Sequence, residues 1–165
     1  MKYLIALLLS FFSSLSHSAP INITASPFHF LMDGGSLALE LKFSKNIAGL
    51  VGYDSFKTAQ YKKNVEKKRV AVTQVGLNYY FSDGGCFSSG PFGGLRAKRL
   101  SLSENGSFER FSVGLKDGDL SVELLGGLMF FYPIGFNVSF STGVNYVEAS
   151  SKFSLGMELK AGWLF

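Results

Sequence analysis

The clearest pattern in this chain is an alternation of apolar with small or polar residues, and it is strongest over residues 153–165. One face of this stretch is apolar, whereas the other carries Ser154, Gly156, Glu158 and Lys160 among its members. Successive side chains of a β-strand point to opposite faces, so this period predicts a strand with one apolar face. We expect it to be the last strand of a transmembrane β-barrel, which faces lipid and closes the sheet against the first strand.

The same alternation predicts seven further strands. The eight predicted strands cover residues 21–32, 37–43, 47–56, 69–81, 92–102, 120–131, 136–146 and 153–165. Pro27 interrupts the first of them, which is tolerated at an edge or a bulge. An even number of strands, with eight as the minimum, is typical of bacterial barrels. The predicted fold is therefore all-β: an eight-stranded antiparallel transmembrane barrel with an up-and-down meander.

The lengths of the connections support this topology with two exceptions. With the N-terminus inside, residues 44–46 and 132–135 are short inner turns, whereas 57–68 and 103–119 are long outer loops. Residues 33–35 are short for an outer loop, and 82–90 are long for an inner turn.

Residues 107–115 alternate as well, which leaves two interpretations. They form either a hairpin extension of the third outer loop or a true barrel strand. The second interpretation leaves residues 21–32 outside the barrel.

The first residues have the layout of a secretory signal peptide. A short positive region, Met1-Lys2-Tyr3, precedes an apolar core over residues 4–12 and a mostly small and polar segment over 13–19. We expect residues 1–18 to be removed by a cut after Ser18, with a cut after Ala19 as the alternative. Residues 19–165 then form the barrel domain. A retained anchor helix is disfavoured, because the apolar core is short.

Composition narrows the function classes. Hydrophobic residues make up 47% of the chain and charged residues 17%, which argues against disorder. The net charge of +4 is too small to indicate a nucleic-acid partner. A single cysteine excludes an intrachain disulfide framework and any site with several cysteine ligands. We expect no cofactor and no metal, and Cys86 is interpreted as a turn residue or a packing residue.

The signal peptide, the eight alternating strands and the terminal aromatic residue together resemble the small OmpA/OmpX-like outer-membrane β-barrel proteins of Gram-negative bacteria. Residues 76–81 and 90–95 also look like strand segments of this class. The resemblance implies a monomer in the cell outer membrane, in contact with membrane lipids and lipopolysaccharide. It also implies that the barrel-assembly machinery recognises the last strand. Trp163 and Phe165 match that assembly signal, although Lys160 stands where a glycine is usual.

Charged residues on the inward faces of the predicted strands are the first candidate site. The predicted lumen network comprises Glu40, Lys42, Arg96, Glu123, Glu158 and Lys160. The interior of an eight-stranded barrel is narrow and filled by side chains. Because an unpaired buried charge is costly, we expect these acids and bases to pair. A structural salt-bridge core is favoured over a proton or ion path, and no open pore is expected.

A basic segment in the first long outer loop is the second candidate. Its cations are Lys57, Lys62, Lys63, Lys67, Lys68 and Arg69. In the predicted topology they face an outer leaflet rich in lipopolysaccharide phosphates, to which cations are attracted. Contact with lipopolysaccharide or a host polyanion is the functional interpretation, and a solvated loop is the alternative.

Catalysis is disfavoured. Some outer-membrane barrels are lipid A deacylases or palmitoyltransferases that use His with Ser, or His with Asp and Ser. Here the predicted mature chain has one histidine, His29, with no visible base–nucleophile motif around it. The sequence predicts a structural surface barrel that contributes to envelope integrity, adhesion or lipopolysaccharide contact. The alternatives are a lipid A-modifying enzyme and a soluble periplasmic lipocalin-like binder.

Overall fold

The computed structural model describes residues 20–31, 33–57, 69–102, 107–110 and 113–165. The predicted signal peptide and four of the basic loop residues, Lys62, Lys63, Lys67 and Lys68, lie outside this part of the chain.

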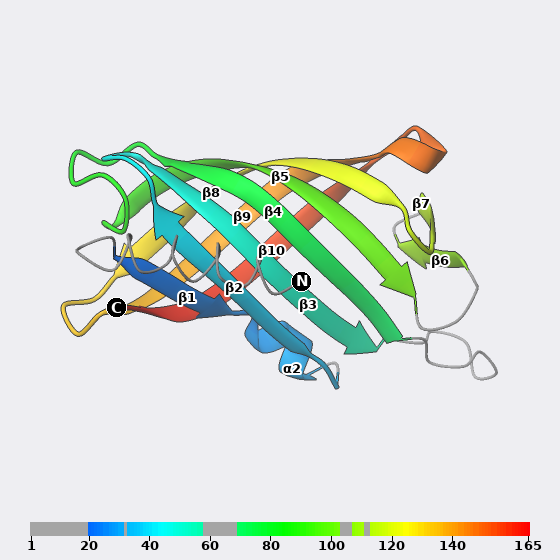
Figure 1. Cartoon of the computed structure of the whole chain (residues 1–165), viewed down its shortest axis with the longest axis horizontal. Helices are drawn as coiled ribbons and strands as arrows, with labels where there is room; N and C mark the ends of the chain where they lie inside the picture. The colour runs from blue at the N-terminus through cyan, green and yellow to red at the C-terminus, as the bar shows by residue number, and fades with distance from the viewer. Residues whose placement is uncertain (1–19, 32, 58–68, 103–106, 111–112) are drawn as a thin grey trace, which may run out of the picture.

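Eight antiparallel strands form a closed barrel, as Figure 1 shows, which confirms the predicted fold class. The order around the barrel is β1-β10-β9-β8-β5-β4-β3-β2. The strands are β1 (Ile21–Ala25), β2 (Gly35–Lys42), β3 (Ile47–Lys57), β4 (Arg69–Tyr80), β5 (Gly90–Leu102), β8 (Leu120–Phe131), β9 (Phe136–Val147) and β10 (Lys152–Leu164). The barrel closes where Phe165 and Ile21 exchange two backbone hydrogen bonds of 2.8 and 3.0 Å.

The third outer connection contains a hairpin of its own. β6 (Ser107–Arg110) and β7 (Val113–Lys116) form a separate two-stranded sheet, while β5 pairs directly with β8. The interpretation of residues 107–115 as a barrel strand is therefore wrong. The structure has the hairpin extension of the third outer loop instead. β7 contacts β5, β10 and the 3-10 turn η1 (Glu148–Ser150), so the hairpin lies across the outer end of the barrel.

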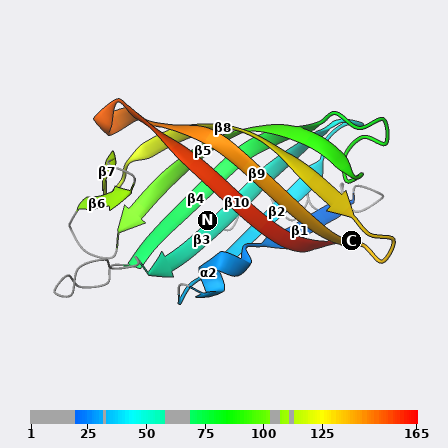
Figure 2. The same cartoon turned by 180° about the vertical axis from the view of Figure 1, so that it is seen from behind.

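The first predicted strand is wrong beyond Ala25. β1 ends there, and a five-residue helix, α2 (Pro27–Leu31), follows it (Figure 2). Proline lacks the N–H that a strand ladder needs, but its fixed φ suits the first turn of a helix. The connection from β1 to β2 thus runs over residues 26–34, which removes the anomaly of a very short outer loop.

No helix in the described part of the chain is long and apolar enough to cross a membrane.

The barrel has an apolar outer surface and a polar interior. The exposed apolar side chains include Leu37, Val51, Val75, Leu77, Leu95, Val122, Leu124, Leu128, Phe140, Val144, Leu155 and Met157. The buried polar side chains include Asn22, Thr24, Glu40, Gln74, Asn78, Arg96, Glu123, Asn137, Ser139, Ser141 and Lys160. A soluble barrel buries its apolar residues instead, so this polarity fits a barrel whose outside faces lipid.

Aromatic side chains gather at both ends of the strands. At the inner end, the rings of Phe136 and Trp163 lie 5.3 Å apart, and the indole N–H of Trp163 donates to the carbonyl of Ile134 at 3.1 Å. At the outer end, the rings of Tyr146 and Phe153 lie 5.1 Å apart. Amphipathic aromatic residues favour the two membrane–water interfaces, so the two groups have the arrangement of two girdles.

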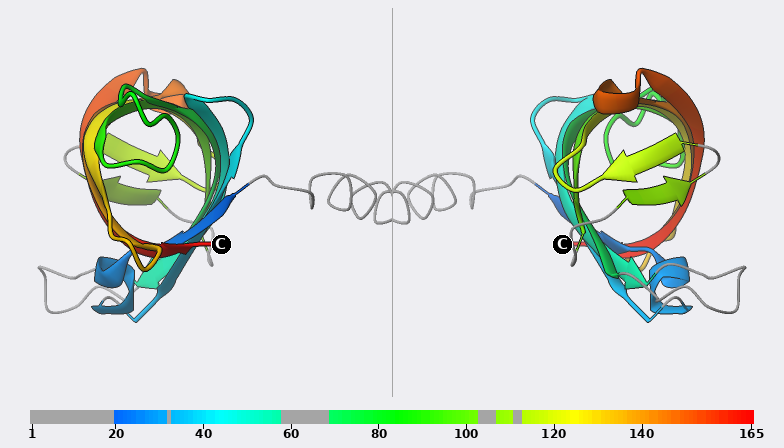
Figure 3. Two further views of the ribbon diagram at one scale, coloured as in Figure 1. Left: turned by 90° about the vertical axis from the view of Figure 1, so that its left-hand side faces the viewer. Right: turned by 90° about the vertical axis from the view of Figure 1, so that its right-hand side faces the viewer.

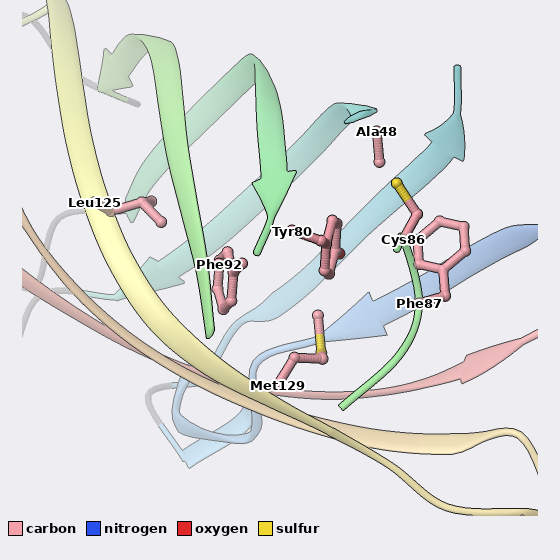
Figure 4. Close-up of a cluster of buried hydrophobic side chains, with 7 residues drawn as sticks. All are labelled: Ala48, Tyr80, Cys86, Phe87, Phe92, Leu125 and Met129. Carbon is pink, nitrogen blue, oxygen red and sulfur yellow. The ribbon is translucent and has the colours of Figure 1, made fainter. Parts of the chain in front are cut away.

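The long inner turn between β4 and β5 folds into the barrel. In the left panel of Figure 3 this green segment lies across the inner mouth, and Figure 4 shows Cys86 and Phe87 beside Tyr80. The backbone N–H of Cys86 donates to the carbonyl of Lys45 at 2.6 Å. Gly85 has a φ of 75°, a left-handed conformation that glycine adopts readily.

An apolar cluster results from this inward fold. Its buried members are Ala48, Tyr80, Cys86, Phe87, Phe92, Leu125 and Met129. The rings of Tyr80 and Phe87 lie 5.9 Å apart. We call this cluster the inner plug. The turn is longer than an ordinary inner turn because it supplies the side chains that fill the inner end of the lumen.

Candidate functional site in the lumen

A cluster of ion pairs occupies the lumen on the inward faces of β5, β8 and β10. The Arg96 guanidinium lies 2.5 Å from Glu158 and 3.9 Å from Glu123. The Lys160 ammonium lies 3.1 Å from Glu158. The Lys98 ammonium lies 2.8 Å from Glu123 and 4.0 Å from Glu158. We call these five side chains the lumen ion cluster. Three basic side chains pair with two acidic ones, so each charge has a partner of opposite sign. A buried charge without such a partner would be costly.

Four of the six predicted network residues meet in this cluster, together with Lys98, which was not among the predicted residues. The alternation already places Lys98 in the lumen, because it follows Arg96 by two positions and therefore lies on the same inward face of the strand. Lys42 lies at the inner end of β2 and is half-buried.

Glu40 belongs to a second network in which its partners are neutral. Its carboxylate accepts hydrogen bonds from the Tyr80 hydroxyl and the Asn78 amide, each at 2.7 Å. The side-chain amide of Asn22 donates to the Glu40 carboxylate at 3.5 Å. The side-chain amide of Asn137 donates in turn to the amide oxygen of Asn22 at 2.7 Å. A buried polar group is costly unless it is hydrogen-bonded, and these contacts satisfy the carboxylate. The expected pairing of every acid with a base therefore does not describe Glu40.

A third group of polar side chains lies near the outer mouth, around Asp54. The Ser36 hydroxyl donates to this carboxylate at 2.5 Å, and the Gln74 amide donates at 3.0 Å. His29 Nδ1 lies 3.5 Å from Asp54 Oδ1, and the imidazole stacks on Phe56 with 4.9 Å between ring centroids. The contact fastens α2 to β3. No pattern in the sequence connects His29 with Asp54, because they lie on different elements.

A cavity of about 360 Å³ separates this outer group from the lumen ion cluster. His29 and Asp54 line it from the outer side, whereas Lys98, Glu123 and Glu158 line it from the lumen. Among the described residues, no three of the metal-binding types His, Cys, Asp and Glu are grouped to hold a metal ion.

Two members of the predicted basic segment are described. Lys57 and Arg69 face each other at the outer ends of β3 and β4. The Lys57 ammonium lies 3.4 Å from Asp33, and both side chains are exposed, so this ion pair contributes little stability.

Cys86 lies outside the membrane-spanning strands, in the inner plug. Burial raises the pKa of its thiol, although the positive charge of Lys42 opposes the shift. The thiol also lies 3.5 Å from the carbonyl oxygen of Ser44. These contacts fit the packing role expected from the sequence.

A closed barrel with an apolar outside, a polar inside and paired lumen charges defines a class: the fold is that of the eight-stranded outer-membrane β-barrels. Comparison of the sequence with protein-family models and with curated proteins finds no match. Among solved structures, the chain is similar to the outer membrane protein Ail of Yersinia pestis, determined as a backbone structure in a phospholipid bilayer nanodisc. The TM-score is 0.52 at 14% identity, over 89% of this chain and 98% of Ail. At this identity the likeness concerns the fold.

Proposed function

We propose that the protein is a surface barrel of the outer membrane, without an open pore, whose lipid-embedded strands carry its outer loops. The observation that carries this proposal is the double obstruction of the lumen. The lumen ion cluster joins β5, β8 and β10 across the interior, and the inner plug fills the inner end. A structural role in the envelope follows more directly from a filled lumen than transport does.

Export through a removed signal peptide and assembly through the last strand belong to the same proposal. The sequence of residues 1–18 supports the first. The position of Trp163 and Phe165 at the closing seam supports the second, because β10 pairs with β1 there.

Reconstitution in planar lipid bilayers tests the absence of a pore. We expect a heat-modifiable, membrane-inserted protein that produces no stable conductance steps. The double variant Arg96→Ala with Phe87→Ala provides the comparison, since it weakens the lumen ion cluster and the inner plug together. Regular conductance steps from the unaltered protein would contradict the proposal.

Contact with lipopolysaccharide through the outer loop between β3 and β4 is the finer part of the proposal. The basic residues Lys62, Lys63, Lys67 and Lys68 support it, because cations gain attraction near an anionic surface. Changing all four to Gln should weaken binding to lipopolysaccharide vesicles and flatten its salt dependence. Changing the same four to Arg preserves the charge and serves as the control. Equal binding by the Gln and Arg variants would exclude the contact.

A lipid A-modifying enzyme is the second candidate, and one observation favours it. His29 Nδ1 approaches the Asp54 carboxylate, as a general base approaches the group that orients it. The Ser36 hydroxyl, however, donates to the same carboxylate. We expect cells that produce the His29→Ala variant to have the same lipid A mass profile as cells with the unaltered protein. A change in that profile would favour the enzyme.

A further inference from the structure

The barrel wall is incomplete along the outer part of β10. β10 pairs with β9 from Lys152 to Trp163, but it pairs with β1 only from Ala161 to Leu164. β1 ends at Ala25, and α2 occupies the position where that strand would continue (Figure 2). Over residues 153–160, no strand in the described part of the chain pairs with the second edge of β10.

The cavity described above reaches this edge. It is lined by inward-facing residues of β10 (Gly156 and Glu158) and also by outward-facing ones (Leu155 and Met157). The two faces of a strand that is paired on both sides are separated by the sheet. On β3, β5 and β8, which are paired on both sides, only inward-facing residues line the cavity, whereas six consecutive residues of β10 line it. This difference indicates that the cavity extends around the free edge of β10 and opens sideways between β10 and α2, toward lipid.

The route through the outer mouth is obstructed. The backbone of the β6–β7 hairpin lies across that end, as the right panel of Figure 3 shows, and β7 contacts β5 and β10. The sideways opening is flanked by apolar groups, because Phe28 also lines the cavity, and Phe28, Phe30 and Leu31 of α2 are exposed. An alkyl chain entering from the membrane would meet apolar side chains first.

Acidic side chains predominate among the charged groups of the lining. Asp54, Asp119, Glu123 and Glu158 line the cavity, and Lys98 is the only lysine or arginine among the described lining residues. Arg96 and Lys160 pair with Glu158 from behind the lining, so four acids face the three cations of the lumen ion cluster. The amide oxygen of Asn145, also on the lining, is buried without a hydrogen-bond partner in the described residues. A positively charged hydrogen-bond donor, such as an ammonium group, would complement these carboxylates and this amide oxygen. The volume lies within the range of about 300–1,000 Å³ that is common for ligand sites.

We propose that this cavity is a lateral binding site for a single-chain amphiphile with an amine head group. The ammonium lies among the carboxylates, and the alkyl chain leaves between β10 and α2 into the membrane. The site rests on the membrane placement proposed above, and it adds a ligand to a barrel that otherwise has a structural role.

The test uses the mature protein in phospholipid nanodiscs, with dodecylamine as the probe and dodecanoate and dodecanol as probes of the same chain length. At pH 7 an alkylamine is protonated, like the side chain of lysine. We expect dodecylamine to cause saturable NMR shifts that are largest at residues 154–159, and the other two probes to cause only small, non-saturating shifts. Equal responses to all three probes, or shifts spread evenly over the barrel, would overturn the proposal.

Two glycine variants test the position of the site. A side chain at Gly156 would point toward the carboxylate of Glu123, whereas at Gly126 the nearest atom is 3.9 Å away and the position faces outward. Gly156→Phe should fill the cavity and weaken dodecylamine binding at least tenfold, and Gly126→Phe should leave it unchanged. Gly156→Phe binding as tightly as the unaltered protein would contradict the site.

Heat-modifiable migration on gels shows whether Gly156→Phe folds. If it does not fold, a charge variant tests the site instead. Asp54→Asn keeps the shape of the side chain but removes one lining charge, and it should weaken dodecylamine binding severalfold. Asp33→Asn, an exposed acid outside the cavity lining, is the matched control. Equal binding by these two variants would overturn the amine assignment. Failure of the unaltered protein to insert into nanodiscs would instead refute the proposed membrane function.

Discussion

Arg96 on β5 and Glu158 on β10 form an ion pair across the lumen, with 2.5 Å between Nη1 and Oε2. Two strands, β8 and β9, separate them around the barrel wall, so this contact joins opposite parts of the sheet. It connects the closing strand to β5 across the interior.

Arg96→Met should lower the free energy of unfolding by about 1.5–3 kcal/mol, the contribution of a hydrogen bond to a charged group, because Glu158 loses its nearest partner but keeps Lys160. Arg99→Met is the control, because Arg99 is exposed on the same strand, and it should change the free energy of unfolding little. Urea unfolding in lipid vesicles, followed by the fluorescence of the single tryptophan, measures both. The double variant Arg96→Glu with Glu158→Arg should recover part of the loss. No recovery would mean that the pair itself is not the cause.

Tyr80→Phe removes a hydrogen bond to the buried Glu40 carboxylate. Bonds to charged groups contribute about 1.5–3 kcal/mol, so we expect a loss of that size in the same unfolding assay. The adjacent Tyr79→Phe removes an identical hydroxyl from a half-exposed, outward-facing side chain and should have little effect. Similar losses from the two variants would argue against the Glu40 network as a stabilising element.

Leu124→Arg and Leu120→Arg compare two depths on the outer face of β8, where both leucines are exposed. In a membrane, Arg near the middle of the bilayer costs about 2–4 kcal/mol, whereas near the interface it costs about 0–1 kcal/mol. Leu124→Arg should therefore be the more destabilising variant in vesicles. Equal and small effects would be the result for a barrel surrounded by water, and would contradict the membrane placement.

Cys86 should react slowly with iodoacetamide. Burial raises the pKa of the thiol, so at a given pH the folded protein holds less of the reactive thiolate than an unfolded chain does. The reaction at pH 8 should be much faster in urea, and in the folded protein it should accelerate only above the ordinary thiol pKa of about 8.5. Asp83→Cys in a Cys86→Ser background places a thiol at an exposed position of the same turn and should react rapidly.

The same shift has a consequence for stability. Because the folded state favours the protonated thiol, the unfolded state binds fewer protons once the pH passes the ordinary thiol pKa, and folding stability falls as pH rises further. The Cys86→Ser variant should lack this alkaline component in unfolding curves measured from pH 7 to 10. A fall of equal size in both proteins would assign it to other groups.

Alternation along the chain predicts the eight barrel strands, apart from the end of the first one, and the face that each strand presents outward. Period two decides the orientation of every side chain, because a slip of one residue would turn an entire apolar set inward. Residues 153–165 illustrate this: Leu155 and Met157 are exposed, and Lys160 is buried. Even the early end of β1 has a local cause in Pro27, a residue that is compatible with the edge or bulge of a strand and equally with the first turn of a helix.

Strand register and the closure of the sheet determine which inward side chains meet and where the wall stays open. Alternation places Arg96, Glu123 and Glu158 on inward faces, but strand register and closure determine that they come together, and that Glu40 meets Tyr80 instead. The contact of His29 with Asp54 depends on how α2 folds back. Contacts across a barrel join residues far apart in sequence, with 62 positions between Arg96 and Glu158. A period of two residues contains no information about such distances, so the ion cluster, the plug and the lateral cavity appear only once the sheet has closed.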